Sequence, residues 1–245
     1  MKTYGIMGFP LTHSFSQKFF TQKFKKEGIG NCQYEVYPVG SAAEIKNLIK
    51  TDPTLEGLNV TIPYKRSVLT YLDDSDKLPT GLRACNCIRI KEGRTIGYNT
   101  DVIGFERSLL PFLKEHHTGA LVLGNGGAAE AVKFVLKKLK LNYKIVSRKI
   151  HTDADLTYGD LTESVIEQNK LIINTTPLGS FPNIDECPDI PYGFLTARHL
   201  LYDLVYNPEK TLFLQKGEAF GAMIKNGYEM LELQAEESWR IWNED

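Results

Sequence analysis

A glycine-rich turn between a predicted strand and a predicted helix is the feature that most constrains this fold. The stretch 120–131 reads Ala-Leu-Val-Leu-Gly-Asn-Gly-Gly-Ala-Ala-Glu-Ala, so a short apolar run enters the turn directly. Behind the turn, apolar residues recur at three- and four-residue steps, as on one helix face, at Val132, Val135, Leu136 and Leu139. The pattern predicts a strand–turn–helix unit of the Rossmann type.

The three glycines of this turn suit an anion site. Gly124, Gly126 and Gly127 let the backbone turn tightly and let a diphosphate approach the start of the helix. Unpaired N–H groups and the positive end of the helix dipole favour an anion there. Ala129 takes the last place of G-x-G-x-x-G, and glycines in such a turn can also serve packing alone. Its place between strand and helix favours a nucleotide site.

Length and composition describe an ordinary globular protein. The 245 residues suit one large or two modest domains, and 42% hydrophobic with 24% charged residues excludes disorder. A net charge of −1 argues against a general nucleic-acid or membrane surface. The first residues lack the long apolar run of a signal peptide, and no run approaches transmembrane length. We therefore expect a cytoplasmic protein.

The four cysteines are scattered along the chain, at Cys32, Cys85, Cys87 and Cys187. Cys85 and Cys87 lie in an alternating stretch that predicts a strand with both thiols on one face. No C-x-x-C or H-x-x-x-H spacing accompanies them, so the sequence predicts reduced core thiols and no metal site.

Strand-like and helix-like patterns alternate along the whole chain. Strands are predicted at 2–8, 33–38, 58–62, 84–91, 95–98, 120–123, 144–147, 170–174 and 200–205. Helices are predicted at 16–26, from the capping-box sequence at 41–44, from 63 through 72, and at 102–114, 162–168, 209–216 and 227–242. A hairpin is expected around 92–94. The alternation predicts parallel sheets with helices on both faces.

Polar residues gather where predicted strands end, and open α/β sheets bind ligands at the carboxyl ends of their strands. Lys65 closes Asn59-Val-Thr-Ile-Pro-Tyr-Lys65, where it is either a surface lysine or a functional one. Asp101 closes Asn99-Thr-Asp101, where it could instead cap the helix that follows. Ser14 and Ser16 are either helix caps or hydroxyl donors to an anion.

The second strand after the glycine turn indicates which cofactor fits. Rossmann sheets that bind NAD place an acid about 20 residues beyond the turn, and those that bind NADP place an arginine there. The strand ends Ser147-Arg-Lys149, with no acid before Asp153. These three residues could hold a 2′-phosphate, with Arg148 making two parallel charge-assisted bonds. The alternative is a solvated basic strand end.

Taken together, these stretches resemble the shikimate dehydrogenase family, in the family's order and over nearly the whole chain. The most specific matches are His13-Ser-Phe-Ser16, Asn59-Val-Thr-Ile-Pro-Tyr-Lys65 and Asn99-Thr-Asp101. The others lie at 4–12, 84–87, 124–128, 147–149, 173–179, 202–206 and 226–234.

The resemblance implies a two-domain α/β fold and an activity. Residues 1–101 with 227–245 would form an N-terminal α/β domain that binds shikimate. Residues 102–226 would form a Rossmann-like NADP-binding domain, with a cleft between the two. The implied reaction is the reversible NADPH-dependent reduction of 3-dehydroshikimate to shikimate, a step of aromatic amino-acid biosynthesis.

The resemblance also assigns site residues. It implies that Lys65 and Asp101 are the catalytic pair. The residues implied to bind substrate are Ser14, Ser16, Thr61, Asn86, Tyr206 and Gln234. Those implied to bind cofactor are Gly124, Asn125, Gly126, Gly127, Ala128, Ser147, Arg148, Lys149, Thr175, Leu204 and Gly227. Small molecules are the expected partners, with no metal, nucleic acid or membrane, and a homodimer is left open.

Three departures from the family pattern bear on these expectations. Val102 stands where the family usually has glycine, and Cys87 replaces a usual threonine. Few residues separate Arg148 from the stretch 155–161, where the family usually has another helix. This shortening affects the adenosine side, so a quinate/shikimate dehydrogenase that uses NAD is an alternative. From a different class of protein, the alternative is a shikimate-binding regulatory protein without turnover.

Overall fold

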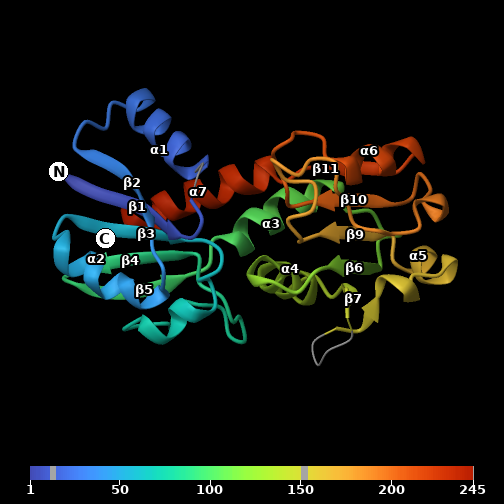
Figure 1. Cartoon of the computed structure of the whole chain (residues 1–245), viewed down its shortest axis with the longest axis horizontal. Helices are drawn as coiled ribbons and strands as arrows, with labels where there is room; N and C mark the ends of the chain where they lie inside the picture. Colours follow the sequence, from blue (N-terminus) through green and yellow to red (C-terminus); the bar gives the residue numbers. More distant parts are fainter. Residues whose placement is uncertain (12–14, 150–153, 245) are drawn as a thin grey trace. The chain divides into compact units, whose positions relative to one another are not determined.

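The chain has the predicted α/β fold, built on two separate sheets (Figure 1). The computed structural model describes residues 1–11, 15–149 and 154–244. It divides into two units, the first formed by Met1–Ile103 with Glu232–Asp245 and the second by Gly104–Leu231. The last helix, α7 (Tyr228–Trp242), begins in the second unit and ends in the first.

The sheet of the first unit is mixed, which corrects the prediction of parallel sheets throughout. Its strands are β1 (Lys2–Gly8), β2 (Cys32–Pro38), β3 (Leu55–Val60), β4 (Cys87–Lys91) and β5 (Arg94–Tyr98), in the order β2-β1-β3-β4-β5. β1 pairs in parallel with β2 and β3, whereas β4 pairs antiparallel with β3 and β5. The antiparallel part is the predicted hairpin, whose turn places Glu92 and Gly93 at positive φ. A two-residue turn can only join antiparallel neighbours.

One face of this sheet is covered by α1 (Phe15–Lys26) and α7 through an aromatic core. Phe20 stacks on Tyr34 at 4.6 Å between ring centroids, and Tyr4 stacks on Trp242 at 5.0 Å. Trp242 packs so closely on β3 that a Cβ at Gly57 would lie 2.4 Å from its Nε1 atom. The predicted helix face at 16–26 is therefore a core face, as its phenylalanine spacing indicated.

The opposite face carries a second core, formed with α2 (Ile45–Thr51). Its fully buried members are Met7, Ile45, Leu58, Val68, Cys85 and Ile88. The predicted capping box is present, because Ser41 Oγ accepts from Ala43 N–H and Glu44 Oε1 accepts from Ser41 N–H. It caps a short 3₁₀ helix, Ala42–Glu44, that leads into α2.

Two helices are shorter than predicted. The segment after Pro63 forms only a 3₁₀ helix, Ser67–Tyr71, because the chain then turns to β5, where Thr95 N–H donates to Asp73 Oδ2 at 2.8 Å. The predicted helix 102–114 is α3 (Asp101–Leu109) followed by a 3₁₀ turn at Leu110–Phe112. Pro111, which has no N–H to donate, accounts for that end.

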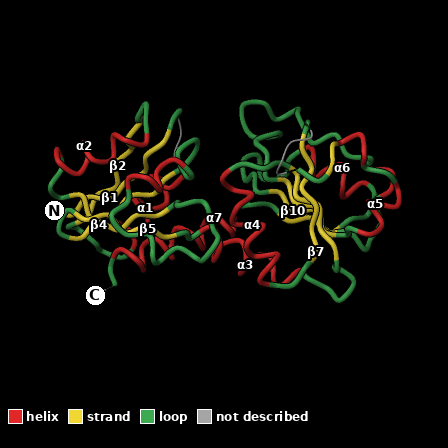
Figure 2. The backbone as a smooth tube through the Cα atoms, turned by 90° about the horizontal axis from the view of Figure 1, so that it is seen from below, coloured by secondary structure: helices red, strands yellow, loops and turns green. Residues whose placement is uncertain are grey.

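The second unit has an entirely parallel sheet, as predicted. Its order is β11-β10-β9-β6-β7-β8, for β6 (Gly119–Leu123), β7 (Asn142–Ser147), β8 (Leu156–Thr157), β9 (Leu171–Asn174), β10 (Leu200–Asp203) and β11 (Met223–Lys225). Seen along the sheet, α3 and α4 (Gly127–Lys138) lie on one side, and α5 (Glu163–Gln168) and α6 (Leu212–Ala219) lie on the other (Figure 2). Every residue of β6, β9 and β10 is buried, as expected for a sheet covered on both faces.

Two strands of this sheet were not predicted, β8 and β11, because two or three residues are too few to show a period. Only residues 148–155 join the parallel strands β7 and β8, and none of those that are described is helical. The shortening noted from the sequence therefore lies directly after Arg148. In the described part of the chain, no helix combines the length and apolar character that crossing a membrane requires.

Candidate functional site

A largely buried ion pair lies beyond the carboxyl end of β3 in the first unit. Lys65 Nζ lies 2.7 Å from Asp101 Oδ2, and the two side chains are only 15% and 8% exposed. Lys65 follows the carboxyl end of β3, and Asp101 is the first residue of α3. The cap of α3 comes from Asn99, whose Oδ1 accepts from Val102 N–H. The side-chain cap of α3 is thus Asn99 and not Asp101, and the catalytic role of Asp101 stays a prediction.

Two hydrogen bonds hold the chain at Lys65 in place. The Lys65 carbonyl accepts from Cys85 N–H at 2.8 Å, and the preceding residue, Tyr64, donates its hydroxyl to the Val39 carbonyl at 2.7 Å. A shielded ammonium bonded to a carboxylate makes a strong, oriented donor. Such a donor can stabilise negative charge that develops on a substrate oxygen and can deliver a proton to it.

Asn86 and Gln234, both predicted to bind substrate, meet beside this pair. Asn86 Nδ2 donates to Gln234 Oε1 at 3.4 Å and to Thr100 Oγ1 at 3.0 Å. Thr100 directly precedes Asp101, and all three side chains are buried. Residues far apart in the sequence, from the end of β3 to α7, thus come together in one polar site.

The other predicted substrate contacts come from other elements, and each is described within its own unit. Ser16 is buried in the first turn of α1, where its side chain hydrogen-bonds the Tyr34 hydroxyl. Thr61 follows β3, and its N–H donates to the Met7 carbonyl at 3.0 Å. Ser14 lies outside the described residues. Tyr206 follows β10 in the second unit, where burial raises the pKa of its hydroxyl.

The glycine turn of the second unit has the geometry of an anion site. Gly124 adopts a φ of 98°, and a Cβ there would lie 2.9 Å from Thr176 Cγ2, so only glycine fits without strain. Gly126 is the N-cap of α4 and has no side chain with which to cap it. The first N–H groups of this 12-residue helix, which begins Gly127-Ala128, can therefore meet an anion, and the turn fits a diphosphate.

Three further cofactor candidates line the same edge of the sheet. Thr175 Oγ1 donates to the Leu123 carbonyl at 2.7 Å, which places it against the glycine turn. Leu204 N–H donates to the Asn174 carbonyl at 3.0 Å. Gly227 packs directly on Leu204, since a Cβ at Gly227 would lie 2.2 Å from the Leu204 carbonyl oxygen. The structure thus brings these candidates together at the ends of β6, β9 and β10.

The basic residues proposed for a 2′-phosphate lie at the end of β7. Ser147 closes the strand, and Arg148 and Lys149 follow it with exposed side chains. Burial raises the pKa of the Tyr158 hydroxyl, and the positive charge of Arg148 opposes that rise. Arg148 therefore lies close enough to Tyr158 to act on it, and its bond to a phosphate stays a prediction.

Sequence reasoning missed a buried carboxyl at the centre of this edge. Asp203 accepts three hydrogen bonds, from Asn174 Nδ2 at 2.9 Å, Val205 N–H at 3.0 Å and Thr211 Oγ1 at 2.6 Å. Its side chain is fully buried, and this burial raises the pKa of the carboxyl to about 6. Asp203 therefore fixes the loops that carry Thr175 and Leu204. The only sequence signal was its place within the 202–206 match.

A second residue that was missed supports the glycine turn itself. Lys133 Nζ, on α4, lies 2.8 Å from Glu130 Oε1 and donates to Asn125 Oδ1 at 3.1 Å. Both partners of the ion pair are largely buried, at 16% and 11% exposure. The spacing of Glu130 and Lys133 predicts a helix pair, but nothing in the pattern indicates the bond back to Asn125.

Comparison with known proteins identifies the family. Residues 6–88 match the family model described as the shikimate dehydrogenase substrate binding domain. The shikimate dehydrogenase (NADP(+)) of Methanococcus maripaludis strain C6 is 34% identical over 98% of this chain and 91% of its own length. That of Staphylococcus epidermidis is also 34% identical, with the same coverage. The chain belongs to the shikimate dehydrogenase family.

Solved structures agree with this fold over 99% of the chain. A shikimate dehydrogenase in complex with NADP⁺ matches with a TM-score of 0.87 and 30% identity, over 90% of its own length. The Thermus thermophilus enzyme, in complex with NADP(H) and shikimate, gives 0.86 and 26% over 94%. A quinate dehydrogenase from Corynebacterium glutamicum in complex with NAD gives 0.85 and 26% over 93%. The predicted fold class is confirmed: an N-terminal α/β substrate domain and a Rossmann-like domain.

Proposed function

We propose that this chain is an NADP-dependent shikimate dehydrogenase that reversibly reduces 3-dehydroshikimate to shikimate, in the cytoplasm, for aromatic amino-acid biosynthesis. The observation that carries the proposal is the shielded Lys65–Asp101 ion pair at a strand end. It occurs in a chain 34% identical to curated shikimate dehydrogenases (NADP(+)). The oxidoreductase reaction needs such a donor beside the carbonyl that is reduced.

Lys65 and Asp101 have distinct roles in this proposal. When bound, NADPH supplies the hydride that is added to the carbonyl carbon. Lys65 Nζ donates a hydrogen bond to the carbonyl oxygen and then transfers a proton to it, which balances the added hydride and yields the hydroxyl. Asp101 orients the ammonium through the 2.7 Å bond, and the neutral amine left by the transfer takes a proton from solvent before the next cycle.

The remaining polar residues hold the substrate in the orientation that this transfer requires. Asn86, Gln234 and Thr61 bind the ring hydroxyls in the proposal, and Ser14, Ser16 and Tyr206 bind the carboxylate. Fixing both ends of a small ring leaves one carbonyl to face Lys65. The match of residues 6–88 to a substrate-binding domain supports the role proposed for residues 1–101 with 227–245.

The cofactor would be held by residues 102–226. The uncapped start of α4, with Gly124 to Ala128, suits the diphosphate, and Ser147, Arg148 and Lys149 suit the 2′-phosphate. Thr175, Leu204 and Gly227 would lie beside the ribose and nicotinamide. Within the described residues, no cluster of three metal-binding side chains was found.

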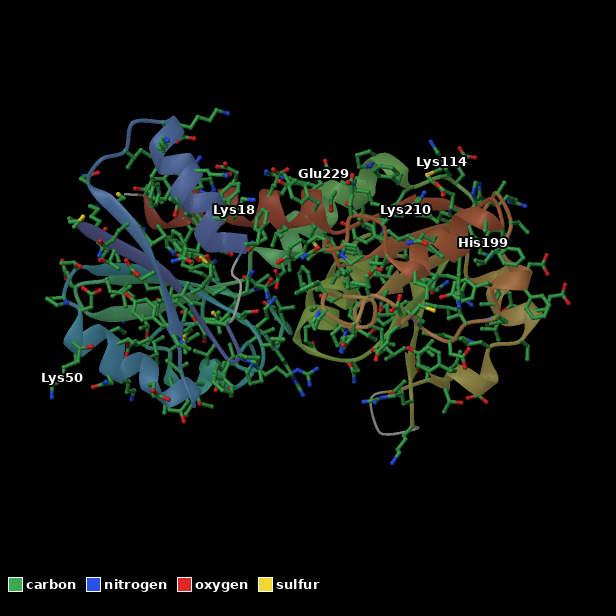
Figure 3. All side chains as sticks on the ribbon, turned by 45° about the horizontal axis from the view of Figure 1, so that its top comes forward. Lys18, Lys50, Lys114, His199, Lys210 and Glu229 are labelled. Atoms are coloured by element: carbon green, nitrogen blue, oxygen red, sulfur yellow. The ribbon has the colours of Figure 1, made fainter. Side chains whose placement is uncertain are left out.

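The test is NADPH absorbance from purified protein with shikimate and NADP. We expect turnover by the wild type and a loss of roughly a thousandfold in kcat for Lys65→Ala, because the oxyanion donor and the proton are both removed. Lys50→Ala is the matched control. Lys50 is an exposed lysine of α2, in the same unit, and its side chain points outward (Figure 3). Full turnover by Lys65→Ala would overturn its role.

The alternative to an NADP-dependent enzyme is a quinate/shikimate dehydrogenase that uses NAD. It is favoured by the similarity to the quinate dehydrogenase–NAD complex and by the short segment after Arg148. Steady-state rates with shikimate and quinate, each with NADP and NAD, separate the two enzymes. Tight binding of shikimate without turnover by either cofactor would instead indicate a regulatory protein.

A further inference from the structure

We propose that Ser238, a residue of α7 with no role assigned above, is a positioning residue for substrate binding. It orients Asn86 and Gln234 through a buried hydrogen-bond network within the first unit. The inference rests on the proposed function, since it concerns the same substrate site. The network is defined by Ser16, Tyr34, Asn59, Asn86, Thr100, Gln234 and Ser238, all of them buried.

Ser238 is the junction of this network. Its Oγ accepts from Asn59 Nδ2 at 3.0 Å, donates to the Gln234 carbonyl at 2.9 Å, and lies 3.2 Å from Thr100 Oγ1. The side chain is fully buried, so no solvent can replace these partners. The Cys87 thiol also hydrogen-bonds Ser238. A buried hydroxyl with these four polar neighbours fixes the position of each of them.

On one side of the junction, Thr100 fixes the amides of the substrate site. Its N–H donates to Asn86 Oδ1 at 2.7 Å, and its Oγ1 accepts from Asn86 Nδ2 at 3.0 Å. If the Asn86 amide were flipped, its Nδ2 donors would face the Thr100 N–H and its oxygen would face Gln234 Oε1. The observed orientation is therefore the stable one. Gln234 Oε1 accepts from Asn86 and from Thr100, at 3.4 and 3.3 Å, which directs its Nε2 donors elsewhere.

On the other side, the network reaches the proposed carboxylate contact. Asn59 Oδ1 accepts from the Tyr34 hydroxyl at 2.8 Å, and Tyr34 in turn hydrogen-bonds the Ser16 side chain. Ser16 and the pair Asn86 and Gln234 are therefore the two ends of one chain of hydrogen bonds. Asn59 Nδ2 also donates to the Asn86 carbonyl at 3.3 Å, so the backbone of Asn86 is held directly. Ser238 adds the side-chain connection, through Asn59 on one side and Thr100 and Gln234 on the other, that sets the positions of the amides proposed to bind the ring hydroxyls.

The experiment measures steady-state kinetics of Ser238→Ala with shikimate and NADP. We expect the KM for shikimate to rise ~10-fold, with kcat within about twofold and the KM for NADP unchanged, because Asn59 and Thr100 each lose a partner. Ser108→Ala is the matched control. Ser108 is a fully buried helix serine in the second unit whose Oγ donates to the Gly104 carbonyl at 2.7 Å, as Ser238 donates to Gln234.

The control separates a positioning role from a merely structural one. Both serine variants should lower the melting temperature, whereas only Ser238→Ala should move the KM for shikimate. Thr100→Val removes the neighbouring hydroxyl at nearly constant volume and tests the same link if Ser238→Ala does not fold. In the double variant, the effects on KM should be less than additive, since both changes break one connection.

The wild type distinguishes the two levels of the proposal. If wild-type protein fails to oxidise shikimate with NADP, the proposed function is wrong. If the wild type turns over and folded Ser238→Ala keeps the wild-type KM for shikimate, the positioning role alone is wrong.

Discussion

The edges proposed to bind ligands differ between the two units in the groups that they present. In the first unit, the edge consists of buried side chains that contact one another, with the Lys65 and Asp101 charges balanced at 2.7 Å. In the second, the glycine turn at the end of β6 presents backbone, with Gly124 at positive φ and an uncapped start of α4, and the buried side chain of Asp203 lies behind it. Its nearby cationic side chains, Arg148 and Lys149, are exposed.

This difference follows from what each edge is proposed to do. Stabilising charge that develops during a reaction requires fixed donors shielded from water, and side chains such as Lys65 provide them. Holding a diphosphate requires N–H groups and room for close approach, which glycines provide. Substitutions at the first edge should therefore act on kcat or on the KM for shikimate, and those at the second on cofactor binding.

The largest effect after that of Lys65 is expected for Asp101→Asn. Asparagine keeps the volume but leaves the shielded Lys65 ammonium without its counter-charge, so its orientation is lost. We predict a fall in kcat of roughly a hundredfold, with a smaller change in the KM for NADP. Initial rates with saturating shikimate and NADP measure it.

An exposed aspartate of the same unit, Asp76, provides the control for that substitution. Asp76→Asn makes the same chemical change without touching the pair and should keep wild-type kcat. If Asp101→Asn retained kcat within about threefold, the contrast between a side-chain edge and a backbone edge would lose its strongest support.

Both edges could be located from the sequence, because local patterns specify them. The apolar run into the glycine turn predicted β6, the turn and α4. The polar residues that follow β3 and precede α3 placed Lys65 and Asp101 at strand and helix ends. These features extend over a few residues each, and period and spacing are visible at that range.

What connects the edges to the core could not be predicted in the same way. The bond between Asn59 and Ser238 joins residues 179 positions apart, and no period indicates it. The bond of Asp203 to Asn174 was hidden for the same reason, since the two residues lie 29 positions apart. The overlong helix 102–114 was a different error, because the local signal of Pro111 was overlooked.

A smaller effect is expected at the second edge, for Arg148→Ala. If Arg148 grips a 2′-phosphate, its loss should raise the KM for NADP ~10-fold and leave kinetics with NAD unchanged. Lys144→Ala is the control, because Lys144 is an exposed cation on the same strand. Equal changes for NADP and NAD would show that Arg148 does not recognise the 2′-phosphate, and would support the NAD-dependent alternative.

The smallest effect concerns stability, at the buried carboxyl of the second edge. Asp203 is held by neutral donors, and burial raises its pKa to about 6, above the ~3.9 of an unfolded chain. Between these two values the folded state binds more protons than the unfolded state, so the contribution of Asp203 to stability falls as the pH rises from about 4 to about 6.

An asparagine at this position cannot ionise, and its amide can still bond Asn174 and Thr211. We therefore predict that the melting temperature of Asp203→Asn, relative to wild type, rises by a few degrees between about pH 4.5 and about pH 7.5. A relative melting temperature that stays constant over this range would mean that Asp203 does not titrate there, and that the second unit holds a permanent buried charge, as the first does.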